Sequence, residues 1–553
     1  MASLLELVDR VNKGEIIDPA QLEVFQESSN SAEKFLAHHA RAMLDLRRAQ
    51  QHMLQSLEAI DYSDQKVLQQ FISISGFLGQ TDLRCAPVVR FGATAINRRD
   101  YALGIEAIQN GVAYDQANGG SFTTDRENCR YIATQYERAA QLIGWHSGQE
   151  LSWNNRQIRV ALIVSGIADE EASGRMIRSL AKNYDAKRMR LCVYSTEAGV
   201  RRERQQFAQM SHVQPSAKRG ARTIEEIAMN KVNAWIASTE GDVVTAAREL
   251  AEQMVKDRVD VAVIDANQAD PIAALVAAWE TATAKINLCR RAPMYAKAVD
   301  CIVYLDQVRY EMDQDLWRRK GIESTYILEG IDVTEALGPA PTRETYGIPE
   351  QSVVLATVSA DLDRSMSEEF VESVIQVLRG NPNAIYLAIG EGEAAWQKRK
   401  FESAGVGKRV GFAGKRRDLP GFLRIADVYL AEFPTAGAAG VLQAMAVERA
   451  IVAMKWGEQA AQAQAATLVG SDAAIVGRDI KAFVERVGKL IREPSARQKL
   501  GKAMQARAEQ HFSFAQTAKH LEQLCEQVLE RKREVPVEQS DEEEDQGRQA
   551  AVA

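Results

Sequence analysis

From Arg156 onward the chain repeats one pattern, in which a short apolar run rich in β-branched residues precedes an amphipathic stretch. RQIRVALIVSG (156–166) is such a run, SGRMIRSLAKNY (173–184) has the apolar spacing of a helix, and MRLCVYSTE (189–197) is the next run. Runs that are apolar at nearly every position predict strands buried on both faces, as in parallel sheets covered by helices. The pattern therefore predicts a doubly wound α/β sheet that begins near residue 156.

Two such sheets are predicted. The first domain, over 156–336, continues with the runs VDVAVIDAN (259–267), AVDCIVYLD (298–306) and STYILEG (324–330). The second domain, over 344–530, contains the runs SVVLATVS, AIYLAIGEGE, KRVGFAG, DVYLAEF and AIVAM. The Pro-rich segment LGPAPTR (337–343) suits a hinge between them. We expect a last helix, over 515–529, to cross back over the first domain.

The first 150 residues predict an all-α domain. Apolar residues recur at intervals of three and four over 33–60, 101–114 and 131–143, which indicates amphipathic helices. The segment YALGIEAIQNGVAYD loosely resembles one helix of a tetratricopeptide pair, but the absence of a clean repeat period favours an irregular bundle. The fold class is thus α/β, with two Rossmann-like domains after a helical one. The acidic tail, 535–553, is expected to be disordered.

Composition excludes several classes of function. The net charge of −7 gives no reason to expect nucleic acid or an anionic membrane as a partner. Six scattered cysteines without a CxxC pair argue against a zinc site and a disulfide framework. The N-terminus does not resemble a signal peptide, and no stretch has the roughly 18 apolar residues of a membrane span. We therefore expect a cytoplasmic protein without a zinc site.

Two facing Rossmann domains are expected to form one cleft at the carboxyl ends of their strands, where helix N-termini favour a nucleotide diphosphate. The first strand ends in SGIADEE, in which Asp169 and Glu170 are candidate general bases for a sugar acceptor. The alternative, that both acids cap the next helix, is favoured. In the second domain SADLDRSMSEEF places Arg364 where a cation neutralises a diphosphate. A surface ion pair is an equal alternative for that arginine.

The third candidate segment is EFPTAGAAGVLQAM, 432–445, whose small residues would let a phosphate reach backbone amides. Tight packing of helix against strand explains the glycines equally well. The basic turn at Lys415, Arg416 and Arg417 and the lone His212 are weaker candidates, because such groups are more often solvated.

At these junctions the chain resembles the O-linked N-acetylglucosamine transferase family and the related bacterial cytoplasmic N-glycosyltransferases, over about 156–530. The resemblance rests on IRVALIVSGIADEEASGRMIRSL, on DVAVIDAN with INLCRRAP and VDCIVYLDQ, and on ADVYLAEFPTAGAAGVLQAM. It implies a GT-B fold and transfer of a sugar from a nucleotide sugar, expected to be UDP-linked, without a metal or a further cofactor. The family's first-loop histidine corresponds to Glu170 here, and its phosphate-facing lysine to Arg364.

In the donor segment the family has hydroxyl residues for the diphosphate and a carboxylate for the nucleoside. The matching positions, which we take as donor-binding together with Arg364 and Gly437, are Ala438, Ala439, Gly440 and Gln443. The first hypothesis is a glycosyltransferase whose helical domain holds a protein acceptor, for example a bacterial surface or flagellar protein. The second is a non-catalytic GT-B subunit that partners or scaffolds a glycosylation or surface-assembly system. An epimerase of the same form is disfavoured, because the second domain offers no histidine before His511.

Overall fold

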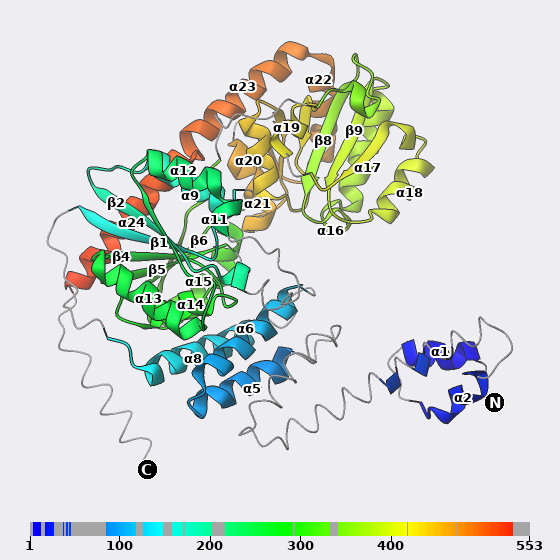
Figure 1. Cartoon of the computed structure of the whole chain (residues 1–553). Coiled ribbons are helices and arrows are strands. Elements are labelled where there is room, and N and C mark those ends of the chain that lie inside the picture. Colours follow the sequence, from blue (N-terminus) through cyan, green and yellow to red (C-terminus); the bar gives the residue numbers. More distant parts are fainter. Residues whose placement is uncertain are drawn as a thin grey trace.

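A computed structural model describes residues 4–12, 17–26, 37, 40–41, 44–45, 85–117, 125–146, 157–169, 172–201, 216–290, 293–331, 341–416, 419–471 and 473–534. Most of the helix predicted over 33–60 and the whole acidic tail lie outside the described residues. The remaining chain forms two parallel sheets, helices that cover them and an N-terminal helical region (Figure 1). The predicted fold class is confirmed.

The first sheet has seven parallel strands in the order β3-β2-β1-β4-β5-β6-β7. The chain moves outward from β1 to β3 and then returns to the other side of β1 as β4. The order therefore reverses between β1 and β4, and ligands of doubly wound sheets bind at the carboxyl end of this switch point. The strands are β1 (Ile158–Val164), β2 (Met189–Ser195), β3 (Asn233–Ile236), β4 (Val261–Asp265), β5 (Ala284–Cys289), β6 (Cys301–Tyr304) and β7 (Glu323–Tyr326).

Helices cover both faces of the first sheet, which explains why β1 is apolar at nearly every position. Val160 and Leu162 face one hydrophobic cluster, whose helices are α9 (Ala172–Asn183), α12 (Ala221–Met229) and α24 (Phe514–Glu534). Ala161 and Ile163 face the other, with α13 (Val243–Lys256), α14 (Pro271–Ala278) and α15 (Gln307–Arg319). An aspartate caps the N-terminus of each of these last three helices: Asp242, Asp270 and Asp306.

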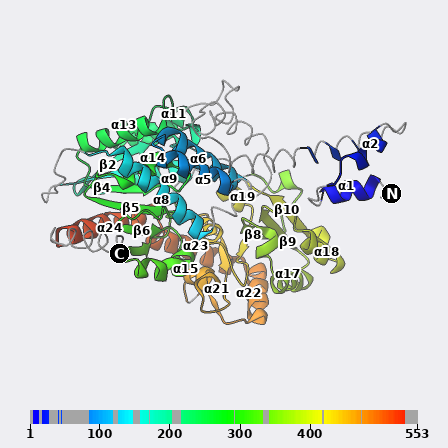
Figure 2. The same cartoon turned by 90° about the horizontal axis from the view of Figure 1, so that it is seen from below.

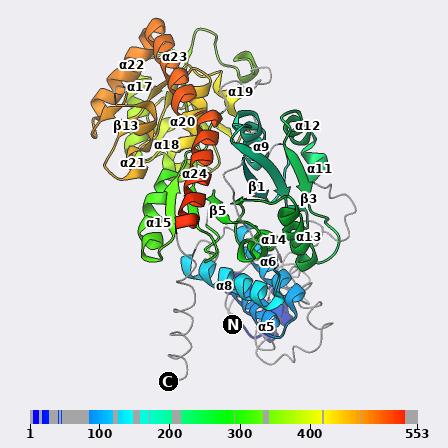
Figure 3. The same ribbon diagram turned by 90° about the vertical axis from the view of Figure 1, so that its left-hand side faces the viewer.

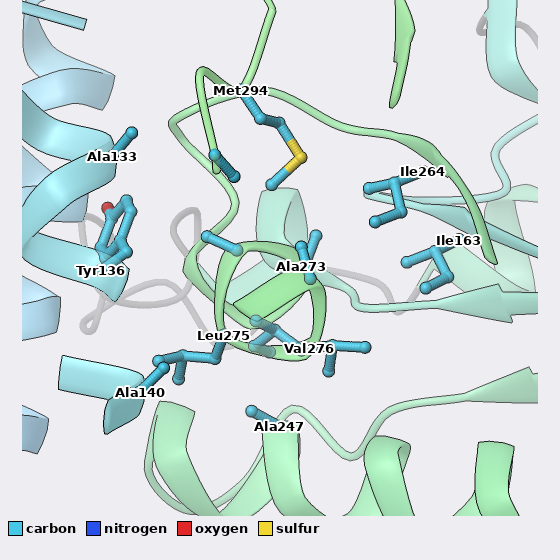
Figure 4. Close-up of a cluster of buried hydrophobic side chains, with 14 of the residues drawn as sticks. Ala133, Tyr136, Ala140, Ile163, Ala247, Ile264, Ala273, Leu275, Val276 and Met294 are labelled. Atoms are coloured by element: carbon cyan, nitrogen blue, oxygen red, sulfur yellow. The ribbon is translucent and has the colours of Figure 1, made fainter. Parts of the chain in front are cut away.

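The N-terminal helices after residue 85 share their core with the first sheet, whereas the two helices before residue 27 belong to a separate small cluster. The helices of this N-terminal region are α1 (Leu4–Asn12), α2 (Ala20–Gln26), α5 (Cys85–Asn97), α6 (Tyr101–Ala117) and α8 (Arg126–Ile143). Ala133, Tyr136 and Ala140 of α8 pack in one cluster with residues of α14 and with Ile163 of β1 (Figure 4). Figures 1 and 3 show α5, α6 and α8 on the side of the first sheet away from the second. Helices α5, α6 and α8 therefore depend on this sheet for part of their buried surface.

The second sheet has five parallel strands in the order β10-β9-β8-β11-β12, with the switch point between β8 and β11. Its strands are β8 (Val353–Ser359), β9 (Ala384–Gly390), β10 (Val410–Gly414), β11 (Val428–Leu430) and β12 (Ala450–Val452). A short pair, β13 (Met454–Lys455) and β14 (Ile475–Val476), lies beyond it. One face packs on α17 (Glu368–Gly380), α18 (Ala395–Ser403) and α22 (Ile480–Arg492). The other packs on α19 (Leu419–Leu423), α20 (Ala438–Ala446), α21 (Ala460–Val469) and α23 (Pro494–His511).

The last helix returns to the first sheet, as predicted. Helix α24 packs against α9, and Figures 1 and 2 show it beside the first sheet while α23 stays with the second. The turn into α24 is held by Ile331, whose N–H donates to the carbonyl of Phe512 at 2.8 Å. A Cβ atom on Gly330 would lie 2.6 Å from Cα of Phe514, so a glycine is required at this crossing.

The strands predicted from apolar runs are confirmed, but β3 and β5 were not predicted. Strand β3 lies at the edge of the sheet, and its run NAWI is only four residues long and partly exposed, which is too short to stand out in the sequence. Strand β5 is fully buried, but Lys285 and Asn287 interrupt its apolar sequence. Asn287 is satisfied there because its Nδ2 donates to the carbonyl of Ile264 at 2.9 Å.

Candidate functional site

The switch point of the second sheet brings two predicted segments together. Strands β8 and β11 are neighbours, with Tyr429 opposite Ala356. Helix α16 (Leu362–Ser365), which carries Arg364, follows the carboxyl end of β8, and α20 follows the carboxyl end of β11. Figure 1 shows α20 and α21 on the side of this sheet that is turned toward the first sheet. The geometry is that of a ligand site in a doubly wound fold.

The loop that carries Arg364 is anchored by two aspartates. Asp361 caps α16 by accepting the N–H of Arg364 at 3.2 Å. Asp363 accepts the N–H groups of Glu393 and Ala394 at 2.9 Å each, which ties this loop to the end of β9. The side chain of Arg364 is exposed, and among the described residues no carboxylate pairs with it. The surface ion pair considered as an alternative is therefore not formed there.

Helix α20 begins with an uncapped N-terminus. Its N-cap, Gly437, is exposed and lacks a side-chain hydrogen bond to the helix, and a Cβ atom there would meet nothing within 4 Å. Ala439 is exposed and Ala438 is half-buried. Free backbone N–H groups at such a helix end favour an anion.

Gly440, in contrast, allows α20 to pack closely against the strands. A Cβ atom at this position would lie 2.5 Å from Oη of Tyr429 and 3.1 Å from the carbonyl oxygen of Val358. The residue is buried between α20 and the strands, which matches the packing alternative. Of the two glycines in this segment, only Gly437 stands at an open position.

Three buried polar atoms around this switch point have no hydrogen-bond partner among the described residues. They are Oγ of Ser365 in α16, Oε2 of Glu432 and Oε1 of Gln443 in α20. An unsatisfied buried polar group costs about 1 to 3 kcal/mol, and such groups are rare away from functional sites. All three belong to the segments that follow β8 and β11, which fits a place where a polar ligand binds.

Glu432 is a site residue that the sequence analysis did not single out. It lies two residues beyond the end of β11 and is 3% exposed. Burial raises the pKa of its carboxyl group to about 8, although the backbone N–H groups of Glu432 and Gly437 oppose this rise. The signal was present in the sequence, since Glu432 is the charged residue that directly follows the buried run DVYLA.

The basic turn after β10 is engaged within the protein. Lys415 forms an ion pair with Glu391, with 2.6 Å between Nζ and Oε1. The guanidinium of Arg416 lies 4.8 Å from the ring centre of Phe422, in a cation–π arrangement. Arg417 and His212 lie outside the described residues.

Asp169, at the switch point of the first sheet, is held by hydrogen bonds. Its Oδ1 accepts the N–H and the hydroxyl of Thr223 at 2.7 Å each, and Oδ2 accepts the N–H of Arg222 at 3.3 Å. Asp169 therefore caps α12. The alternative considered in the sequence analysis was a cap on the next helix, which is α9. These contacts favour a structural role for Asp169, and its catalytic role stays a prediction. Glu170 lies outside the described residues.

Two further pairs of strand ends in the first sheet are tied by buried polar groups. Arg290, at the end of β5, donates to Asp265 at the end of β4 with 2.9 Å between Nε and Oδ2, and to Glu329 at 2.6 Å. At the ends of β1 and β4, Ser165 donates to the buried Asp270 at 2.7 Å. The sequence analysis named neither pair, because each partner lies in a different segment of the chain.

Comparison with known proteins supports the interpretation of the second sheet as part of a glycosyltransferase fold. Residues 353–493, which include both of its switch-point segments, match the family model described as "Glycosyl transferases group 1". This match confirms the predicted resemblance to GT-B glycosyltransferases for that part of the chain. No curated protein matches the chain significantly.

Several solved structures are similar to the chain. An O-GlcNAc transferase mutant from Thermobaculum terrenum is 13% identical, with 96% of this chain and 99% of that chain covered and a TM-score of 0.49. A glycosyltransferase from Rickettsia africae is 12% identical, with 68% and 99% covered and a TM-score of 0.46. HepE of Anabaena, in complex with UDP and glucose, is 12% identical, with 67% and 100% covered and a TM-score of 0.45.

Two classes of site or segment are not found in the part of the chain that the structure describes. None of its helices is long and apolar enough to cross a membrane. No group of three or more histidine, cysteine or acidic side chains there has an arrangement that would hold a metal ion.

Proposed function

We propose that the chain is a glycosyltransferase that transfers a sugar from a nucleotide sugar to a protein acceptor. One observation carries the proposal: within the segment that matches glycosyltransferases, the exposed Arg364, which pairs with no described carboxylate, and the open N-terminus of α20 share one switch point. A fixed cation and a helix N-terminus together suit the diphosphate of the donor.

Each donor-site residue has a role in this proposal. Arg364 stabilises the charge that develops on the leaving diphosphate. Ala438 and Ala439 donate their backbone N–H groups to the phosphates, which approach over the open position at Gly437. Gln443 hydrogen-bonds the ribose or base with its amide oxygen, which has no partner among the described residues. Helix dipole and guanidinium supply the positive charge in this scheme. The nucleotide is expected to be UDP, by the resemblance described above.

The acceptor polypeptide is proposed to bind on the side of the helical region and the first sheet. Tyr136 of α8 donates its hydroxyl to the carbonyl of Gln268 at 3.2 Å, so the helical region reaches the loop that precedes α14. That loop lies at the switch point of the first sheet. A division into a helical domain (1–150), an acceptor domain (156–336) and a donor domain (344–530) follows as part of the proposal.

Calorimetry of the intact chain against a panel of UDP- and GDP-sugars tests the proposal. We expect one donor to bind, and Arg364→Ala to weaken binding roughly 10- to 100-fold, the scale of a charged hydrogen bond of about 1.5 to 3 kcal/mol. Arg379→Ala is the matched control, because Arg379 is also exposed but lies at the C-terminal end of α17, at the opposite edge of the sheet. Binding of no donor, or equal effects of the two variants, contradicts the proposal.

A non-catalytic GT-B subunit is the second candidate. Ala438, Ala439 and Gln443 stand where the resembling family carries hydroxyls and a carboxylate, and this substitution favours a protein that binds without turnover. Release of nucleoside diphosphate by the pure chain, lost in Arg364→Ala, would exclude it. A stable complex with an active transferase, together with no turnover of any donor, would support it.

A further inference from the structure

The first sheet holds a buried carboxylate at its switch point. Ser165 follows the last residue of β1, and Asp270 begins α14 after β4, so the two residues bridge the strands between which the order reverses. This is the edge at which a doubly wound sheet receives a ligand.

Two hydroxyl groups donate to one oxygen of Asp270. Ser165 Oγ lies 2.7 Å and Thr196 Oγ1 lies 2.6 Å from Oδ2, while Oδ1 accepts the N–H of Ala273 at 3.0 Å. Asp270 is 1% exposed and Thr196 is fully buried, but Ser165 is only half-buried. Ser165 is thus the group of this cluster through which a ligand reaches the carboxylate.

The surroundings of Asp270 are charged. Arg201 is 5% exposed, and its Nε has no hydrogen-bond partner among the described residues. The positive charge of Arg201 interacts with the negative charges of Asp270 and Glu197. Glu197 is fully buried, and its Oε1 accepts the hydroxyl of Ser195 at 2.7 Å. Burial raises the pKa of Asp270, so its carboxylate takes up a proton more readily than an exposed one.

We propose that Ser165 is a catalytic residue that contacts the nucleophilic group of the acceptor, and that Asp270 is a positioning residue that receives the acceptor's proton through Ser165. The inference rests on the proposed transferase function. In this proposal the acceptor's proton is taken up by Ser165 and Asp270, and not by Asp169 or Glu170.

The step balances as follows. The acceptor heteroatom forms a bond to the anomeric carbon while the bond from that carbon to the donor phosphate breaks, and the diphosphate leaves with the electron pair. The acceptor proton passes to Oγ of Ser165 as the hydroxyl proton of Ser165 passes to Oδ2 of Asp270. After the product leaves, Asp270 returns the proton to solvent by the same route.

The test measures nucleoside diphosphate release by the full chain from UDP- and GDP-sugars, with water or arrayed peptides as acceptor. We expect Ser165→Ala to lower kcat about 100-fold or more, the scale of a lost proton acceptor, with the donor KM unchanged. Ser165→Thr should restore turnover. Thr245→Val is the matched control, because it removes a hydroxyl bond to another helix-capping aspartate, Asp242, outside this cluster and should change kcat less than about 3-fold.

The pH profile separates proton transfer from packing. Wild-type turnover should fall at low pH as Asp270 becomes protonated beside Arg201 and Glu197, and Asp270→Asn should be slow and lack this acidic limb. Unchanged turnover in Ser165→Ala, or an equal loss in Thr245→Val, overturns the inference. If Glu170→Gln alone abolishes turnover, Glu170 is the base and the inference is also wrong. If the wild type turns over no donor, the proposed transferase function is wrong, and the inference that rests on it is wrong too. Calorimetry then shows whether the protein still binds a donor.

Discussion

Replacement of Glu432 by glutamine should make the protein more stable, and the gain should grow with pH. Glutamine has the same shape, and its carbonyl oxygen can still accept the N–H of Gly437. In the wild type, burial raises the pKa of this carboxyl from 4.5 to about 8. The unfolded chain therefore releases the proton at a lower pH than the folded chain does, so the wild type loses stability as pH rises from 4.5 to 8.

The size of the effect follows from the linkage of proton binding to folding. Between the two pKa values, each pH unit changes the free energy of unfolding by about 1.4 kcal/mol. From pH 5.5 to 7.5 the wild type should lose about 2 to 3 kcal/mol relative to Glu432→Gln. For a domain of roughly 150 to 250 residues, a loss of this size lowers the Tm by about 5 to 10 °C.

Thermal melts of both proteins at half-unit steps from pH 5.5 to 8 measure the effect. Trp456 stacks on Phe433, with 5.0 Å between ring centres, so its fluorescence reports on the neighbourhood of Glu432. Glu509→Gln is the control, because Glu509 is exposed on α23. Parallel melting curves of wild type and Glu432→Gln over this range would refute the reasoning, since they would mean that the buried carboxyl titrates as it does in water.

Four other substitutions have defined outcomes. Asp169→Ala should lower the stability by about 1 to 2 kcal/mol through loss of the cap on α12, with donor binding unchanged in calorimetry. Gly440→Ala should cost about 1 to 3 kcal/mol in denaturant unfolding because its Cβ would press on Tyr429, whereas Gly437→Ala should leave stability nearly unchanged and weaken donor binding. If Glu170 is the general base, as the resemblance implies, Glu170→Gln should retain folding and donor binding and cut transfer roughly 100-fold or more; unchanged transfer would remove it from the mechanism.

The sequence alone predicted both sheets, because the strands of a parallel sheet are covered on both faces and must be apolar at nearly every position. The runs that became β1, β8 and β11 carry this pattern, with Arg159, Thr357 and Ser359 as their polar residues. For the same reason the sequence located the loops that follow these strands, including Arg364 and Gly437. Strands that were polar or exposed, such as β3, left no such signal.

Only the tertiary structure decided what each residue in those loops contacts. Gly437 and Gly440 are the same residue type, yet a Cβ atom would be free at Gly437 and would collide with Tyr429 at Gly440, because the packing of α20 buries only the second position. Asp169 caps a helix more than fifty residues away, and Asp270 meets Ser165 across two strands, because the order of a doubly wound sheet joins segments that are distant in the chain. Strand formation depends on the local apolar pattern, whereas these contacts depend on which strands become neighbours.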